Sequence, residues 1–274
     1  VKIIWGGVHA TLFSKQVCEE AHPDHVIIGE GENPLANIFG IKTRFNSLDD
    51  NPWGAWDMVN IEKYIARRFW AKRVLTLNTS RGCIWKCAFC HNQGQEGTEY
   101  RYLSAINIFK QILYLGLKYG IDGVQFAEDC FDANRMRLKE ICKLNHGMIK
   151  FAHSSSIPFA NEEILREEKD AGLAFIEYGV ESGSQRVLNM LNKKQTPDSI
   201  RNAYKICKRL KISTGAMFMI GMPEETEVEL QTTLKLIDEI DCDISVCSIF
   251  RPYPKTPIFE QIKNHTQIHL PSTM

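Results

Sequence analysis

Short apolar runs alternate with helical patterns along most of this 274-residue chain. Six continuous apolar runs follow residue 73, and between them apolar residues recur every three or four positions. Continuous runs are typical of buried parallel strands, whereas a period near 3.6 residues is typical of amphipathic helices. The predicted strands are Val74 to Asn78, Gly123 to Ala127, Ile149 to His153, Phe175 to Val180, Thr214 to Ile220 and Ile244 to Ile249.

The helical stretches between these strands begin at residues that favour N-caps. Ser104, Asp132 and Asn161 each precede a helical pattern, and "TEVE", Thr226 to Glu229, has the form of a capping box. Alternating strands and helices require a parallel sheet with right-handed crossovers, and six such units can curve into an open barrel. We therefore predict an α/β fold with a partial six-stranded (β/α) barrel over residues 74–264, which binds ligands at the C-terminal ends of its strands.

A smaller unit precedes this barrel. Residues 1–40 read as strand, double-glycine turn, helix, strand, glycine turn and helix, with the crossover helix expected over Thr11 to Glu20. This pattern is typical of the C-terminal part of a doubly wound domain. Because the chain opens inside an apolar run, we expect it to be the later part of a longer protein. Residues 41–73, which contain "NPWGAWD", are predicted to form a linker, and residues 265–274 a tail.

Composition narrows the partners that this fold would have. Hydrophobic residues make up 44% of the chain, and Lys+Arg and Asp+Glu both total 33, without a long run of like charge. This balance disfavours nucleic acid or an anionic membrane as partner. No apolar run approaches the roughly 20 residues that a membrane-spanning helix needs. The odd number of cysteines, nine, indicates reduced thiols, so we predict a cytoplasmic protein.

Three cysteines stand close together after the first predicted barrel strand. Cys83, Cys87 and Cys90 have the spacing C-x3-C-x2-C, and their loop is expected at the mouth of the barrel. Three thiolates can hold three corners of a 4Fe-4S cluster and leave the fourth iron open. A zinc site would need a fourth ligand, and His91 lies too close to Cys90 to serve without strain. We interpret the loop as an iron-sulfur site, with zinc as the alternative.

The segment "CIWKCAFC" resembles the cysteine signature of the radical S-adenosylmethionine (SAM) enzymes, with an aromatic residue before the last cysteine. The resemblance extends over residues 74 to about 260 and includes "FAEDCF", "GVES" and "MIGMP" after later strands. It implies that SAM chelates the open iron through its amino and carboxylate groups. The residues that it assigns to SAM are Phe89, Glu128, Asp129, Ser156, Glu181, Ser182 and Gly221. Related enzymes often carry arginine near the position of Ser156, so the contact to the SAM carboxylate stays unassigned.

The N-terminal segments "GGVHATL" and "VIIGEGE" resemble the last two strand-loop units of the cobalamin-binding domain found in one branch of this family. In that domain, glycine loops let the backbone approach the nucleotide tail of cobalamin. The resemblance therefore assigns Gly6, Gly7, Gly29 and Gly31 to cobalamin. The segment that carries a histidine ligand to cobalt would lie upstream, so cobalamin binding is expected of the full-length protein.

The resemblance also implies a reaction. An external one-electron donor such as flavodoxin or ferredoxin would reduce the cluster, and SAM would be cleaved reductively to methionine and a 5'-deoxyadenosyl radical. Methyl transfer to an unactivated carbon of a small-molecule or natural-product substrate is the leading prediction. The alternatives are cyclisation or rearrangement, a methylthiotransferase, and a non-enzymatic iron-sulfur or zinc-binding module. Methylthiotransferases carry a further cysteine set upstream, whereas residues 1–73 contain only Cys18.

Overall fold

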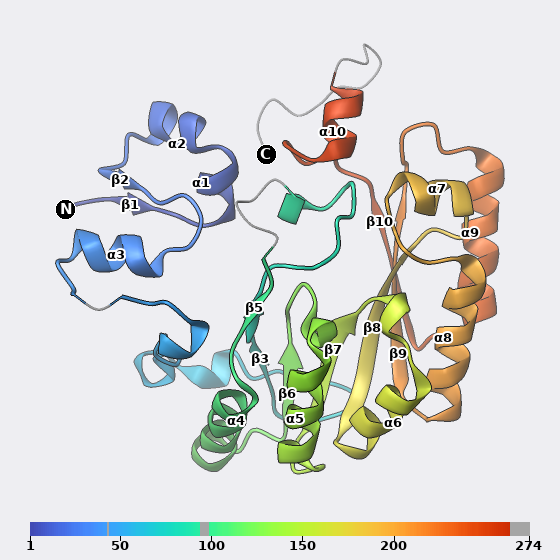
Figure 1. Cartoon of the computed structure of the whole chain (residues 1–274), viewed down its shortest axis with the longest axis horizontal. Helices are drawn as coiled ribbons and strands as arrows, with labels where there is room; N and C mark the ends of the chain where they lie inside the picture. Colours follow the sequence, from blue (N-terminus) through green and yellow to red (C-terminus); the bar gives the residue numbers. More distant parts are fainter. Residues whose placement is uncertain (43, 94–98, 264–274) are drawn as a thin grey trace.

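The computed structural model describes residues 1–42, 44–93 and 99–263, so the predicted tail, residues 265–274, lies outside the described residues. Its centre is a six-stranded parallel sheet with the order β10-β9-β8-β7-β6-β3 (Figure 1). The strands are β3 (Val74–Leu77), β6 (Gly123–Phe126), β7 (Lys150–Ser155), β8 (Leu173–Glu181), β9 (Ser213–Ile220) and β10 (Ile244–Ile249). All six predicted strands and the partial barrel are confirmed.

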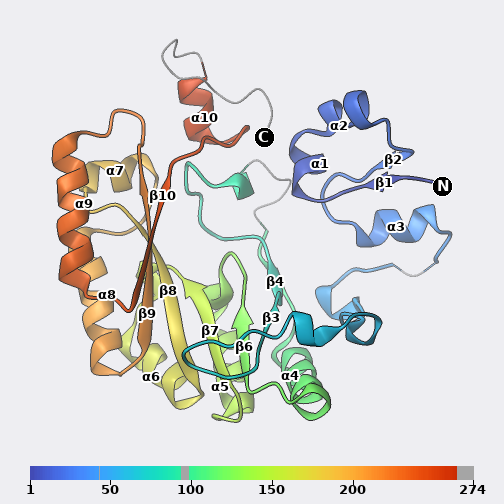
Figure 2. The ribbon, with the colours of Figure 1, turned by 180° about the vertical axis from the view of Figure 1, so that it is seen from behind.

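Helices follow the strands and cover the outer face of the sheet (Figures 1 and 2). They are α4 (Ala105–Tyr119), α5 (Arg135–Asn145), α6 (Glu162–Asp170), α8 (Pro197–Arg209) and α9 (Glu227–Ile240), while the shorter α7 (Gln185–Met190) and α10 (Pro257–Ile262) follow β8 and β10. Ser104, Asn161 and Thr226 cap their helices as predicted. The prediction for Asp132 is wrong, because this residue lies in a 3-10 turn and Asn134 caps α5 instead.

Side chains alternate between two faces of the sheet. Those facing the helices, such as Val124, Ile176 and Phe218, join the main hydrophobic core. The opposite face is concave, and a second cluster closes its N-terminal end with Trp70, Val74, Ala152 and Phe175. The ring of Phe69 meets Phe175 edge-on, with 5.6 Å between centroids. Figure 2 shows the end of the linker crossing the lower end of the sheet, so this segment forms a floor under the barrel.

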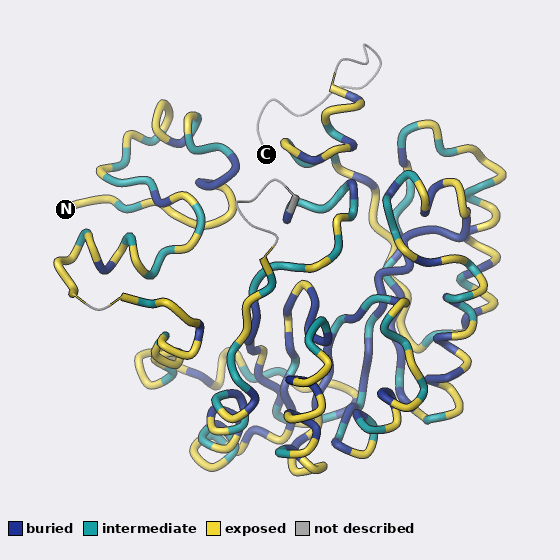
Figure 3. Tube along the Cα trace, in the orientation of Figure 1, coloured by how far each residue is buried: buried dark blue, intermediate teal, exposed yellow. Residues whose placement is uncertain are grey.

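The N-terminal unit is small and mostly exposed (Figure 3). Strands β1 (Ile4–Trp5) and β2 (His25–Val26) pair in parallel, as expected for a doubly wound domain, but they are shorter than the apolar runs predicted. The other elements are α1 (Val8–Leu12), α2 (Ser14–Ala21) and α3 (Glu32–Ile38). The predicted crossover helix is therefore two helices, because the backbone of Phe13 leaves the helical region with φ −121° and ψ 36°.

Short 3-10 helices lie in the linker and at the strand ends of the barrel. The described part of the linker contains three of them, and others follow the cysteine loop, β6 and β7. They are Leu48–Asp50, Trp56–Met58, Ile61–Lys63, His91–Gln93, Phe131–Ala133 and Ile157–Phe159. An antiparallel ribbon of β4 (Ser80–Arg81) and β5 (Arg101–Tyr102) extends beyond β3. This ribbon carries the arginines that contact the N-terminal unit.

Ion pairs join the N-terminal unit to this ribbon. Glu30 accepts hydrogen bonds from Arg101 at 2.8 Å and lies 3.1 Å from Arg81, and Glu32 accepts from Arg81 at 3.1 Å. These contacts lower the pKa of both carboxyls, chiefly through the hydrogen bonds from the arginines. The loop between β2 and α3 is therefore held beside the residues that directly precede Cys83.

Candidate cluster and cofactor site

The three cysteines lie on one loop at the C-terminal end of the sheet, and each is partly buried. Burial, and to a lesser degree the neighbouring thiols, raise the pKa of Cys87 and raise that of Cys90 to about 11. A hydrogen bond with the buried Cys130 thiol lowers the pKa of Cys83. Metal coordination deprotonates thiols outright, so three partly buried thiols on one loop are ligands of the kind that an iron-sulfur cluster takes. In the part of the chain that the structure describes, no three His, Cys, Asp or Glu side chains form a metal-binding group.

Backbone contacts hold this loop in place from two sides. The N–H of Ala88 donates to the carbonyl of Leu191 at 2.9 Å, and the N–H of Ile258 donates to the carbonyl of Ala88 at 3.1 Å. The side-chain amide of Asn192 donates to the carbonyl of Lys86 at 2.6 Å. The loop is therefore anchored to the residues that follow α7 and to the start of α10. These anchors fix the cysteines relative to the end of β8.

Phe89 packs, partly buried, against a small apolar cluster near the mouth of the barrel. The buried members of this cluster are Val187, Leu191, Met222, Phe250, Ile258 and Ile262. The aromatic ring between two ligand cysteines thus secures the loop from its apolar side, next to the residues that follow β9 and β10.

The two acidic residues after β6 have different surroundings. Glu128 is buried and accepts hydrogen bonds from the N–H of Thr79 at 2.5 Å, from the Thr79 hydroxyl and from the Ser80 hydroxyl. The guanidinium of Arg137 lies 3.9 Å from the same carboxylate. Asp129 is exposed. The side-chain oxygens of Glu128 are thus engaged inside the protein, and Asp129 is the accessible carboxylate of the pair; the assignment of both residues to SAM stays a prediction.

Glu181 and Ser182, at the end of β8, also have different surroundings. Glu181 lies at a bulge with φ 67°, and its carboxylate is 3.2 Å from the ammonium of Lys193. Ser182 is fully buried, and its hydroxyl bonds to that of Thr233 at 3.1 Å. The Ser182 side chain therefore supports the turn against α9, and its assignment to SAM stays a prediction.

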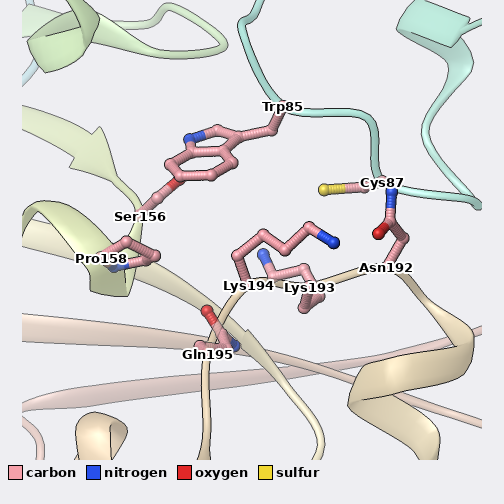
Figure 4. Close-up of a pocket in the computed structure, with 8 residues that line it drawn as sticks. All are labelled: Trp85, Cys87, Ser156, Pro158, Asn192, Lys193, Lys194 and Gln195. Carbon is pink, nitrogen blue, oxygen red and sulfur yellow. The ribbon is translucent and has the colours of Figure 1, made fainter.

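A small hollow brings the cysteine loop, β7 and the segment after α7 together (Figure 4). Its lining includes Trp85, Cys87, Ser156, Pro158, Asn192, Lys193, Lys194 and Gln195. Sequence reasoning missed the two lysines, although "NKKQ" directly follows the helix after "GVES". They place positive charge beside Ser156, where the expected arginine is absent.

The glycines assigned from the sequence differ in how strictly they need to be glycine. Gly221 after β9, Gly7 after β1 and Gly29 after β2 have φ of 78°, 93° and 76°, in the left-handed region that favours glycine. A Cβ added at Gly7 or Gly29 would meet no atom within 4 Å, so the backbone there faces open space. Gly6 and Gly31 do not have positive φ.

One hydroxyl joins the two N-terminal glycine loops. Thr11 donates to the carbonyl of Gly7 at 2.9 Å and accepts from the N–H of Gly29 at 2.9 Å. Its side chain is buried between them, so the loops after β1 and β2 are held as one surface.

Known proteins share both the sequence and the architecture. The model of the Radical SAM superfamily matches residues 77–237, more than half of the chain. An uncharacterised methyltransferase of Pyrococcus horikoshii is 28% identical, covering 95% of this chain and 62% of the relative. The anaerobic magnesium-protoporphyrin IX monomethyl ester cyclase of Cereibacter sphaeroides is 25% identical, covering 97% of this chain and 49% of the relative.

Among solved structures, the methyltransferase TsrM from Kitasatospora setae matches with a TM-score of 0.78 and 16% identity, covering 94% of this chain and 59% of that one. This likeness shows the fold. The chain spans about half to three fifths of the length of these relatives. No helix in the described ranges is long and apolar enough to cross a membrane. On the match over residues 77–237, together with the cysteine loop at the mouth of the partial barrel, the chain belongs to the radical SAM superfamily.

Proposed function

We propose that the full-length protein is a cobalamin-dependent radical SAM enzyme that transfers a methyl group to an unactivated carbon of a small molecule. The observation that carries this proposal is the cysteine loop, which faces the Glu181–Lys193 pair across the C-terminal end of the sheet while a glycine-loop unit docks on the adjoining ribbon. When bound to the three cysteines, a 4Fe-4S cluster supplies the electron for reductive cleavage of SAM.

The charges at the strand ends match the groups of SAM. Asp129 offers a carboxylate to the amino group, and Glu181, which is largely buried, offers one to the ribose hydroxyls. Lys193 supplies the positive charge that a SAM carboxylate needs and that the uncharged hydroxyl of Ser156 does not provide. Gly221 leaves the backbone after β9 free of a side chain on the side expected for the adenine ring.

The N-terminal unit supports the cobalamin part of the proposal. Gly7 and Gly29 face open space and are joined through Thr11, which gives a backbone surface without side chains for a large cofactor to approach. The structural relative TsrM was solved with cobalamin and a 4Fe-4S cluster bound, and the relative from Pyrococcus horikoshii is named a methyltransferase. Cyclisation is the second candidate, because the cyclase of Cereibacter sphaeroides aligns with 97% of the chain.

Product analysis of the full-length protein tests the proposal. After anaerobic reconstitution with iron and sulfide, the protein receives SAM, cobalamin, a one-electron reductant and a set of candidate small molecules. We expect a methylated product, and we expect it to depend on cobalamin. Cleavage of SAM that proceeds equally without cobalamin, with a cyclised product, would replace methyl transfer by the second candidate. Absence of SAM cleavage in protein that carries its cluster would refute the radical enzyme itself.

Binding measurements test the residue assignments separately from turnover. Glu181→Ala should weaken SAM binding by about 1 to 3 kcal/mol while the iron content stays constant, since a charge-assisted hydrogen bond is lost. The exposed Glu163 on α6 provides a matched control, because Glu163→Ala removes the same charge away from the strand ends. Equal SAM affinity in both variants would remove Glu181 from the site.

A further inference from the structure

Glu177 lies on the concave face of the barrel, in the middle of β8. Its neighbours along the strand, Ile176 and Tyr178, are buried in the core under the helices, whereas Phe175 belongs to the floor cluster on the opposite face. Because successive residues of a strand point to opposite faces, Glu177 points the same way as Phe175. Its side chain is only partly buried, so part of it can be reached from this face of the sheet.

The neighbouring strands leave room around this carboxylate. Ser154 on β7 and Gly215 on β9 are its partners in register. A Cβ at Gly215 would lie 2.7 Å from the ring of Phe175 and 3.1 Å from the side chain of Glu177, so only glycine accommodates both groups. Gly179, the next residue of β8 on the same face, also has no side chain. The Glu181 carboxylate and the Lys193 ammonium occupy the space above Gly179, because a Cβ there would lie 2.7 Å and 3.0 Å from them, so the Glu177 carboxylate stands between Gly215 and this pair.

Within the described residues, the interaction recorded for the Glu177 carboxyl is with a neutral group. The hydroxyl of Ser154 hydrogen-bonds to the carboxyl, and burial raises the pKa of Glu177 above its usual value. Among residues 1–42, 44–93 and 99–263, no Lys or Arg forms an ion pair with it. The nearest carboxylate along this face, Glu181, is by contrast paired with Lys193. A partly buried carboxylate without a cation is unfavourable, and a cationic ligand would compensate it.

We propose that Glu177 and Ser154 form a substrate anchor that binds a protonated amine with an apolar body. The anchor lies between the aromatic floor of Phe69, Trp70 and Phe175 and the Glu181–Lys193 pair near the cysteine loop. The ammonium would donate to the carboxylate and to the Ser154 hydroxyl oxygen, and the apolar body would contact the rings of the floor. This inference rests on the proposed function, because it names the substrate class of that site.

Benzylamine is a suitable probe, since it joins an ammonium to an aromatic ring, and benzoate and benzyl alcohol are its anionic and neutral counterparts. Calorimetric titration of the reconstituted full-length protein should give saturable binding of benzylamine and none of benzoate. Glu177→Gln should weaken benzylamine binding by at least about tenfold, as expected for loss of a charge-assisted hydrogen bond, and should leave binding of benzyl alcohol unchanged. Glu163→Gln, on the exposed surface of α6, should have no effect.

The result that overturns the anchor is equal benzylamine affinity in the wild type and Glu177→Gln, or the absence of saturable benzylamine binding. Ser154→Ala, which removes the hydroxyl alone, should weaken benzylamine binding by a smaller factor. This variant tests the anchor if Glu177→Gln does not fold. Iron content and SAM affinity are measured on the same preparations. A protein that binds benzylamine but neither iron nor SAM would refute the proposed function and leave the anchor standing. A protein that binds iron and SAM but not benzylamine would refute the anchor alone.

Discussion

Replacing Arg81 by Met should loosen the N-terminal unit from the barrel. Arg81 contacts Glu30 at 3.1 Å and Glu32 at 3.1 Å; Glu30 lies in the loop that connects β2 with α3, and Glu32 is the first residue of α3. Methionine keeps much of the length of the side chain but removes the charge and the donors. Glu30 would retain its contact with Arg101, and Glu32 would lose its only arginine partner among the described residues.

The expected effect is modest because these groups are partly solvated. The side chains of Arg81, Glu30 and Glu32 are 39%, 39% and 26% exposed. Exposed ion pairs contribute about 0.2 to 1 kcal/mol each, so two such contacts give about 0.4 to 2 kcal/mol. A change of this size alters a local opening equilibrium by a factor of about 2 to 30.

Hydrogen exchange with mass spectrometry measures this opening. In Arg81→Met, peptides from residues 1–42 should exchange faster by the factor above, while β8 and β9 keep their protection. Arg209→Met is the matched control, because Arg209 pairs with Glu162 and both lie within the barrel. Raising the salt from 0.1 to 1 M shortens the Debye length from about 10 to about 3 Å and should produce part of the same change in the wild type. Unchanged exchange of residues 1–42 in Arg81→Met, or equal change in both variants, would refute the reasoning.

Three further predictions follow from the site and the core. Cys90→Ala should abolish the cluster, measured as iron and sulfide per chain, whereas Cys142→Ala, on the buried side of α5, should keep it. Lys193→Met should weaken SAM binding, measured by calorimetry, by about 1.5 to 3 kcal/mol, because a hydrogen bond from the Lys193 ammonium to the charged SAM carboxylate is lost. Unchanged SAM affinity would exclude Lys193 from the SAM site. His153→Ala should lower the free energy of unfolding by about 3 to 5 kcal/mol at pH 7, because it leaves the buried Glu168 without its partner at 2.8 Å. A loss below 1 kcal/mol in chemical denaturation would contradict this.

The buried His153–Glu168 pair also predicts a pH dependence. Burial alone would lower the pKa of His153, but the charge and hydrogen bond of Glu168 outweigh it and raise the pKa to about 9. The stabilisation is therefore fully present below the unfolded pKa of about 6.5 and is lost as the pH rises through about 9. Denaturation of the wild type and His153→Ala between pH 6 and 10 should converge at the alkaline end. A constant difference across this range would show that His153 is not protonated in the folded state.

Local patterns in the sequence were sufficient for the framework of the fold. The six strands, the caps at Ser104, Asn161 and Thr226 and the cysteine loop depend on periodicity and on residues a few positions apart. Prediction failed where local choices compete. Asp132 and Asn134 are both good N-cap residues, and Asn134 prevails because Asp132 is drawn into a buried turn, where the Ser155 hydroxyl bonds to it.

The sequence by itself determined the family, the six strands of the barrel and the three thiols, because these are encoded in contiguous segments. Only the tertiary structure decided which polar side chains reach the site. Glu128 and Asp129 are adjacent in the chain, yet one is buried under Thr79 and Ser80 and the other faces solvent. The pairing of Glu181 with Lys193 and the position of Glu177 beside Ser154 and Gly215 likewise arise from strand register and from the fold of distant segments, which no local pattern specifies.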